Sequence, residues 1–183
     1  MLLRVEPPQA AASTATDGLG PGRVLGAVVE RQRAERWCWA AVAAGVAAYY
    51  GAECSQEDVA RALGRGGGPS DDNPSGGEAS GGARLDEALS AVGCFSHWSP
   101  GRPAWDRLVA ELVEGRPVGV QIRWRGGGSH FVLLCGAWDG LVHVADPATG
   151  AAALRFPDFP RAYRDGGVWD GTFWTRPPEP CAR

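Results

Sequence analysis

Residues 37–50 read WCWAAVAAGVAAYY, fourteen residues without one charged side chain. The length and the alanine content favour a helix over a strand, and apolar side chains all round this helix predict that it is buried. Gly51 follows it as a typical helix end. One thiol, Cys38, lies between two tryptophans in the first turn, where a rigid buried helix would hold it in a fixed position.

Further helices, and then strands, are predicted on either side of this stretch. The residues Ser55-Gln-Glu-Asp58 have the spacing of a capping box and predict a second helix that ends near Gly64. Asp139-Gly140 is a strong hairpin signal. Apolar spacing predicts helices over residues 84–92 and 103–114, and strands over 26–30, 118–124, 130–138, 141–145, 151–156 and 168–175. Helices followed by antiparallel strands predict one α+β domain.

The composition excludes several classes of protein. Glycine (27) and proline (14) make up about a fifth of the 183 residues, which argues against a helical bundle. The 18 basic and 21 acidic residues nearly balance, so we expect no nucleic-acid partner. No apolar run is long enough to span a membrane, and no membrane partner is expected. The five cysteines include no C-x-x-C pair and no histidines have metal-ligand spacing, so neither a metal nor another cofactor is expected.

Two segments have the composition of loops or tails. Residues 1–24 lack a hydrophobic period and predict a disordered tail, which leaves a domain over residues 25–183. The first residues contain no stretch typical of a signal peptide, so we expect a cytoplasmic protein or one exported without a cleavable signal peptide. The long loop over residues 64–83 is either a plain solvated insertion, the favoured interpretation, or a lid over a site.

Cys38 is the first candidate for chemistry. A helix N-terminus carries about half a positive charge, which favours a thiolate and lowers the pKa of a thiol. The alternative is that Cys38 is one more small buried residue of an alanine-rich helix.

A thiolate nucleophile needs a base and an orienting group, and His130 and Asp146 suit these roles. His130 follows three glycines and Ser129 at the start of a strand, where the rim of the sheet opens. The turn at residues 139–140 returns the chain, so Asp146 should lie beside His130 on the neighbouring strand. Taken singly, His130 could be an exposed loop residue, and Asp146 could be the turn former that Asp-Pro pairs often are.

Acyl transfer also needs hydrogen-bond donors for the oxyanion. The backbone N–H of Cys38 is free at the start of its helix, and the side-chain amide of Gln32, six residues earlier, could be a second donor. By itself, Gln32 would be interpreted as a solvated residue among charged neighbours.

Together these residues resemble the papain-like cysteine proteases. The resemblance covers residues from about 28 to 175 and rests on Gln32-x5-Cys38, Trp37-Cys38-Trp39-Ala40-Ala41, Gly128-Ser129-His130-Phe131-Val132 and Asp146-Pro147-x-x-Gly150. It is strongest to a bacterial group that includes effectors of plant pathogens, and it extends to the peptidases that trim double-glycine leader peptides. It implies a nucleophile at Cys38, a base at His130, an orienting Asp146 and an oxyanion donor at Gln32. It also implies a helical lobe and an antiparallel half-barrel with a cleft between them.

The function expected from this resemblance is hydrolysis of peptide bonds in a peptide or protein substrate, by a monomer. Trp39, Trp124, Gly128 and Ser129 are the residues that we expect to line the substrate cleft. The alternative for each tryptophan is an ordinary core position, and Trp37 and Trp39 cannot both face the cleft, because they lie two residues apart on one helix. Two alternatives use the same fold. One is an acyl transferase, such as a transglutaminase or peptide cyclase, in which an amine replaces water. The other is a module that binds a peptide without catalysis.

Overall fold

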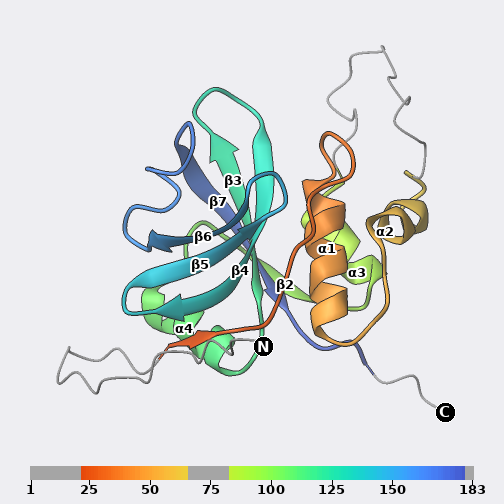
Figure 1. Ribbon diagram of the computed structural model, residues 1–183, viewed down its shortest axis with the longest axis horizontal. Coiled ribbons are helices and arrows are strands. Elements are labelled where there is room, and N and C mark those ends of the chain that lie inside the picture. The colour runs from red at the N-terminus through yellow and green to blue at the C-terminus, as the bar shows by residue number, and fades with distance from the viewer. Residues whose placement is uncertain (1–21, 66–82, 180–183) are drawn as a thin grey trace, which may run out of the picture.

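A computed structural model describes residues 22–65 and 83–179 of the chain (Figure 1). Within these ranges a mixed α/β structure is formed around one seven-stranded antiparallel sheet. The strands are β1 (Arg23–Val24), β2 (Phe95–Pro100), β3 (Val118–Trp124), β4 (Ser129–Trp138), β5 (Leu141–Asp146), β6 (Gly150–Arg155) and β7 (Gly167–Thr175). The helices are α1 (Cys38–Tyr49), α2 (Gln56–Ala62), α3 (Leu85–Ala91) and α4 (Trp105–Val113). Cys181 and most of the predicted tail and long loop lie outside the described residues.

The four predicted helices and the strands from β3 onward are confirmed. In α1, every residue from Cys38 to Ala47 is buried, as expected of a helix that is apolar all round. In α2, the predicted capping box is present: the Asp58 N–H donates to Ser55 Oγ at 3.1 Å, and the Ser55 N–H donates to Asp58 Oδ2 at 3.0 Å.

The first strand is not where the apolar pattern over residues 26–30 predicts it. It is β1, inside the predicted tail, and it pairs with Gly136 and Ala137 of β4. Glycine is needed there, because a Cβ on Gly136 would lie 2.9 Å from the Cα of Val24. The apolar segment packs on α1 instead, where a Cβ on Gly45 would lie 2.7 Å from the backbone oxygen of Val28. Close packing on a helix therefore replaces strand pairing for these residues.

The order of strands brings the two halves of the chain together. Along the sheet it is β2-β7-β3-β4-β5-β6, with β1 paired to β4. Helix α1 contacts β4 of the sheet as well as α2 and α3. Figure 1 shows these three helices on one side of the sheet, with the start of α1 and the β3–β4 turn at the same end of the molecule. Among the described residues, no helix is both long and apolar enough to span a bilayer.

Candidate active site

Cys38 is the first residue of α1, and its side chain is almost fully covered, with 7% of the residue exposed. A tight turn leads into it, in which the Trp37 N–H donates to the Ala34 carbonyl at 3.2 Å and Arg36 adopts a left-handed φ of 68°. A non-glycine residue in this conformation is uncommon and often lies near a functional site. The turn fixes where the thiol emerges at the helix start.

His130 and Asp146 are joined across the β4–β5 hairpin. The register pairs Leu133 with Ala145, so the start of β4 and the end of β5 lie at the same end of the hairpin. His130 Nε2 and Asp146 Oδ1 are 2.7 Å apart, and both side chains are buried. The predicted closeness of these two residues is therefore observed.

The imidazole of His130 also contacts the thiol of Cys38. Burial alone would lower the pKa of His130, but hydrogen bonds with Asp146 and with Cys38, and the charges of both, outweigh burial and raise the pKa to about 9. Because Nε2 faces Asp146, the other ring nitrogen is the one available to the sulfur. At neutral pH, this site therefore holds an imidazolium between the sulfur of Cys38 and the carboxylate of Asp146.

The carboxylate of Asp146 has several further partners. Oδ1 also accepts the Ala148 N–H at 2.7 Å, whereas Oδ2 accepts the Tyr163 hydroxyl at 2.6 Å and lies 3.7 Å from Nη1 of Arg164. Burial would raise the pKa of Asp146, but its hydrogen bonds with His130, Tyr163 and Ala148 hold that pKa well below its usual range. Asp146 is therefore a fixed negative charge.

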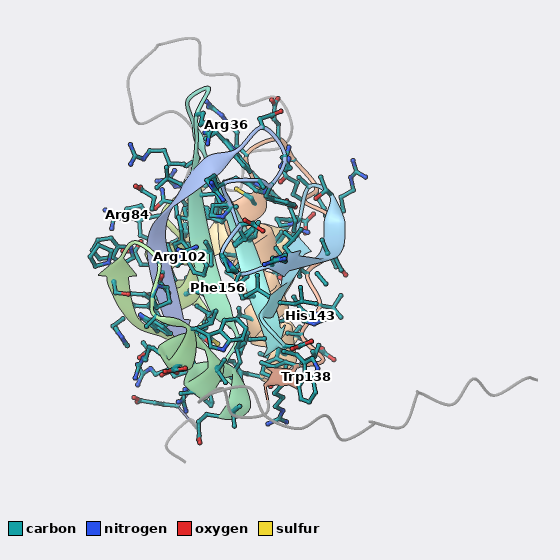
Figure 2. All side chains as sticks on the ribbon, turned by 90° about the vertical axis from the view of Figure 1, so that its left-hand side faces the viewer. Arg36, Arg84, Arg102, Trp138, His143 and Phe156 are labelled. Carbon is teal, nitrogen blue, oxygen red and sulfur yellow. The ribbon has the colours of Figure 1, made fainter. Side chains whose placement is uncertain are left out.

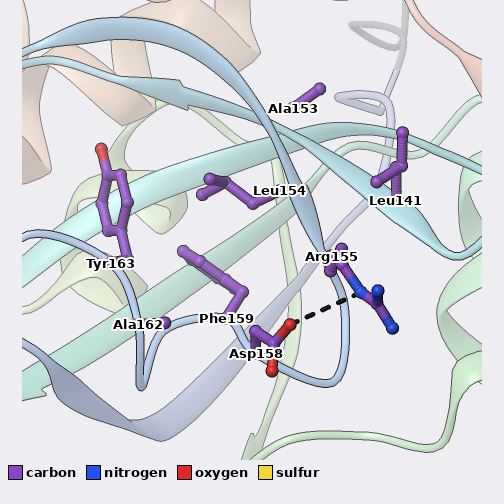
Figure 3. Close-up of a pocket in the computed structure, with 8 residues that line it drawn as sticks. All are labelled: Leu141, Ala153, Leu154, Arg155, Asp158, Phe159, Ala162 and Tyr163. Atoms are coloured by element: carbon purple, nitrogen blue, oxygen red, sulfur yellow. Dashed lines mark ion pairs between the residues drawn. The ribbon is translucent and has the colours of Figure 1, made fainter.

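Tyr163 is a site residue that the sequence did not reveal, because it lies in a turn-rich segment without a motif. Burial and the hydrogen bond to Asp146 raise the pKa of the Tyr163 phenol to about 12, so it stays a donor. Its ring also lines a cavity of about 310 Å³ next to Leu154 and Phe159 (Figure 3). An ion pair between Arg155 and Asp158 lies in the wall of the same cavity.

Trp124, a predicted cleft residue, covers one face of His130. The two rings are stacked, with centroids 6.0 Å apart and an interplanar angle of 23°. The guanidinium carbon of Arg164 lies 5.2 Å from the centroid of the Trp124 ring. The predicted cleft residues Gly128, in the adjoining turn, and Ser129, at the start of β4, are both exposed. The Trp124 N–H closes this turn by donating to the Gly128 carbonyl at 3.1 Å.

Trp39 does not lie where the prediction puts it. Only 1% of this residue is exposed, which argues against the expected contact with a substrate. A helix turns about 100° per residue, so residues two apart face different directions. Trp39 faces the core, whereas Trp37 is only partly buried.

Gln32 is held beside the site by its backbone and by its side chain. Its N–H donates to the Pro147 carbonyl at 2.8 Å, directly after Asp146. Its side-chain Nε2 donates to the Ala34 carbonyl at 3.0 Å, in the turn that leads to Cys38. An amide nitrogen has two hydrogens, so one remains for another acceptor.

The site lies at one end of the molecule. Arg36, two residues before Cys38, and Trp138, at the far end of β4 from His130, lie at opposite ends in Figure 2. A second cavity, of about 280 Å³, extends between the start of α3 and the sheet. Phe131, the neighbour of His130, lines it together with Arg84, Trp98, Gln121 and Phe173.

The sequence matches one protein family over most of its length. The model of the Peptidase_C39 like family matches residues 24–168, most of the chain. The chain belongs to this family. The predicted membership of the papain-like cysteine protease group is thereby confirmed. No curated protein matches the sequence.

Two solved structures have the same fold as this member of the C39-like family. One is a Bacillus anthracis protein described as a C39-like peptidase, with 14% identity and a TM-score of 0.55 over 84% of this chain and 97% of its own. The other is the peptidase domain of Streptococcus ComA, a bifunctional ABC transporter involved in a quorum-sensing pathway. It has 15% identity and a TM-score of 0.56 over 81% of this chain and 98% of its own.

Proposed function

We propose that this chain is a cysteine peptidase that hydrolyses peptide bonds with Cys38 as the nucleophile, His130 as the base and Asp146 as the orienting group. The observation that carries the proposal is the position of His130, which contacts the Cys38 thiol and the Asp146 carboxylate at once. A charged imidazole beside a thiol favours the thiolate, which is the reactive form of cysteine. Membership of a cysteine peptidase family supports the same activity.

In the first half of the reaction, the Cys38 sulfur attacks the carbonyl carbon of the scissile peptide bond. The carbonyl oxygen becomes an oxyanion, stabilised by the Cys38 backbone N–H and the Gln32 side-chain amide. The imidazolium of His130 then gives its proton to the leaving nitrogen. The C–N bond breaks, an amine leaves, and a thioester to Cys38 remains.

In the second half, water replaces the amine. Neutral His130 takes a proton from water as its oxygen attacks the thioester carbon. The C–S bond breaks, a carboxylic acid leaves and ionises, and Cys38 returns as a thiolate beside the imidazolium. Asp146 stays charged throughout, because its function is to orient His130 and to stabilise the charge of its ring.

The substrate lies in the cleft beside Trp124, Gly128 and Ser129 in this proposal. Trp124 shields His130 from water, and the exposed turn residues contact the substrate backbone. The 280 Å³ cavity that Phe131 lines is large enough for one substrate side chain. The partner is a peptide or protein, which the cleft binds as an extended segment.

Active-site labelling tests the proposal. The protein is treated with an epoxysuccinyl peptide inhibitor at about pH 6 to 7, where an unactivated thiol is largely protonated, and its intact mass is followed over time. We expect one adduct, which is absent in Cys38→Ala and forms much more slowly in His130→Ala. The matched control is Cys54→Ala, because Cys54 is a free and more exposed thiol outside the site and its loss should leave the adduct unchanged. Labelling spread over several cysteines, or an equal rate in His130→Ala, would contradict an activated Cys38.

A further inference from the structure

Gln56 is a buried polar side chain that the reaction described above does not use. It is the first residue of α2 and only 2% exposed. Its Nε2 donates to the Arg31 carbonyl at 2.9 Å, and its Oε1 accepts the Arg33 N–H at 3.0 Å. One amide group therefore satisfies the backbone on both sides of Gln32.

The backbone of Gln32 is also held from the opposite element. Its own N–H donates to the Pro147 carbonyl at 2.8 Å, in the turn that follows β5. The backbone of residues 31–33 is thus fixed between α2 and the turn that carries Asp146. Only the side-chain torsions of Gln32 remain, and the hydrogen bond to Ala34 restricts these.

The position of Gln56 is itself well defined. The capping box of Ser55 and Asp58 fixes the start of α2 and with it the first residue of the helix. Arg33 also pairs with Glu57 at 3.0 Å, but both side chains are largely exposed, and such surface pairs contribute little. The buried amide of Gln56, rather than this ion pair, sets the course of the segment.

We infer that Gln56 is a positioning residue for the oxyanion donor Gln32, an inference that rests on the proposed function. Donors in an oxyanion hole act through their fixed position, and an error of about 1 Å costs on the order of a hundredfold in rate. Gln56 acts through the backbone of residues 31–33 and does not touch the substrate. Its loss should impair only those steps in which an oxyanion forms.

Two reactions of the same thiol separate this role from a merely structural one. Hydrolysis of the p-nitrophenyl ester of N-benzyloxycarbonylglycine passes through an oxyanion. Alkylation of Cys38 by iodoacetamide is a direct displacement that forms none. A variant that misplaces Gln32 slows the first reaction and spares the second, whereas a variant that damages the whole site slows both.

The variant to measure is Gln56→Met, which keeps the volume of the side chain and removes both hydrogen bonds. We expect kcat for the ester to fall about tenfold to a hundredfold, and no further than in Gln32→Ala. The rate of Cys38 alkylation should stay within about twofold of the wild type, because the thiol and His130 are untouched. Gln56→Glu, which keeps the acceptor for the Arg33 N–H, should have an intermediate effect and provides a second, milder variant.

Two controls complete the experiment. Val59→Ala removes packing from the same helix at a fully buried position, and it should leave the ratio of the two rates unchanged. In a Gln32→Ala background, Gln56→Met should cause no further loss in ester hydrolysis, because the donor that it positions is gone.

The inference is overturned if Gln56→Met leaves ester hydrolysis intact, if it slows both reactions equally, or if its effect persists in full without Gln32. Failure of the proposed function looks different. In that case, the wild type and Cys38→Ala hydrolyse the ester at the same rate, and the inference fails together with the proposed function.

Discussion

The Tyr163 hydroxyl donates to Asp146 Oδ2 at 2.6 Å, while the other oxygen, Oδ1, lies 2.7 Å from His130 Nε2. The two oxygens of one buried carboxylate are thus assigned to different partners. A carboxylate held at both oxygens cannot rotate about its terminal torsion. The ring of His130 therefore has a fixed acceptor, which Tyr163 maintains without touching the histidine.

Tyr163→Phe removes this donor and keeps most of the ring packing. A hydrogen bond to a charged group contributes about 1.5–3 kcal/mol, so the free energy of unfolding at neutral pH should fall by about that amount. Because Tyr163 lowers the pKa of Asp146, the variant should also have a higher Asp146 pKa. A carboxyl group whose pKa is lower in the folded state stabilises that state at pH values above its unfolded pKa, and this stabilisation is lost as the pH falls. The difference in stability between the variant and the wild type should therefore shrink below about pH 4. Urea unfolding measures both effects.

Tyr50→Phe is the matched control for this variant. Tyr50 also has a partly buried hydroxyl, which is hydrogen-bonded to Thr175 at 3.0 Å, with no carboxylate involved. Its loss should cost less, about 0.5–1.5 kcal/mol, and should leave Cys38 alkylation unchanged. An equal loss of stability in the two variants, with the same pH dependence, would contradict a special role of Tyr163.

Asp146→Asn should shift the pH dependence of Cys38 alkylation. Burial lowers the pKa of His130 and the hydrogen bond and charge of Asp146 raise it, so the variant has the lower pKa. The imidazolium beside the thiol is then lost at lower pH. Alkylation near pH 7 should slow about tenfold when the pKa of His130 falls to about one unit below the assay pH, because only about a tenth of the rings are then protonated. The control is Asp170→Asn, which breaks a surface ion pair with Arg123. Superimposable pH profiles for Asp146→Asn and the wild type would contradict this coupling.

The raised pKa of His130 also predicts how stability changes with pH. The charged ring stabilises the folded state fully below the ordinary pKa of 6.5, and this contribution is lost as pH rises towards about 9. Between pH 6.5 and about pH 9, the free energy of unfolding of the wild type should therefore fall relative to that of His130→Gln. Urea unfolding at several pH values measures the difference. His143→Gln, on β5, should track the wild type, and a constant gap between wild type and His130→Gln would refute the prediction.

Trp124 should matter for the orientation of His130. Trp124→Ala uncovers the stacked face of the ring and leaves it freer to turn away from Cys38, so alkylation should slow by about tenfold. Trp124→Phe keeps an aromatic face and should recover much of the rate. Trp138→Ala, at the exposed far end of β4, should change nothing. The comparison is made by intact mass, and an unaffected Trp124→Ala would show that the stacking does not orient the ring.

Much of the fold follows from local patterns. Three elements can be predicted from a few neighbouring residues each. These are α1 from its uncharged run, α2 from its capping box, and the β4–β5 hairpin from Asp139-Gly140. The strand β2 was not predicted, because its residues, Phe95–Pro100, include serines, a histidine and a proline. Its extended form depends on pairing with β7, which lies far along the chain.

The site residues also differ in whether local sequence patterns predict them. Cys38, His130 and Asp146 could be proposed from a helix start and the geometry of one hairpin. Tyr163 and Gln56 could not, because neither lies in a motif, and each acquires its role from hydrogen bonds to segments that only the folded chain brings near. Trp39 was predicted in the cleft because it follows Cys38 in the sequence, but neighbouring residues of a helix point in different directions.

The β4–β5 hairpin also bears on the order in which the site assembles. His130 and Asp146 are separated by 16 residues joined through a tight turn, so bringing them together costs little loop-closure entropy. Cys38 belongs to an early helix that reaches β4 only through long-range packing, which is the slower kind of contact to form. A newly synthesised chain can therefore pair its histidine and aspartate from hairpin residues alone, and it gains a reactive thiol only once the helix has docked.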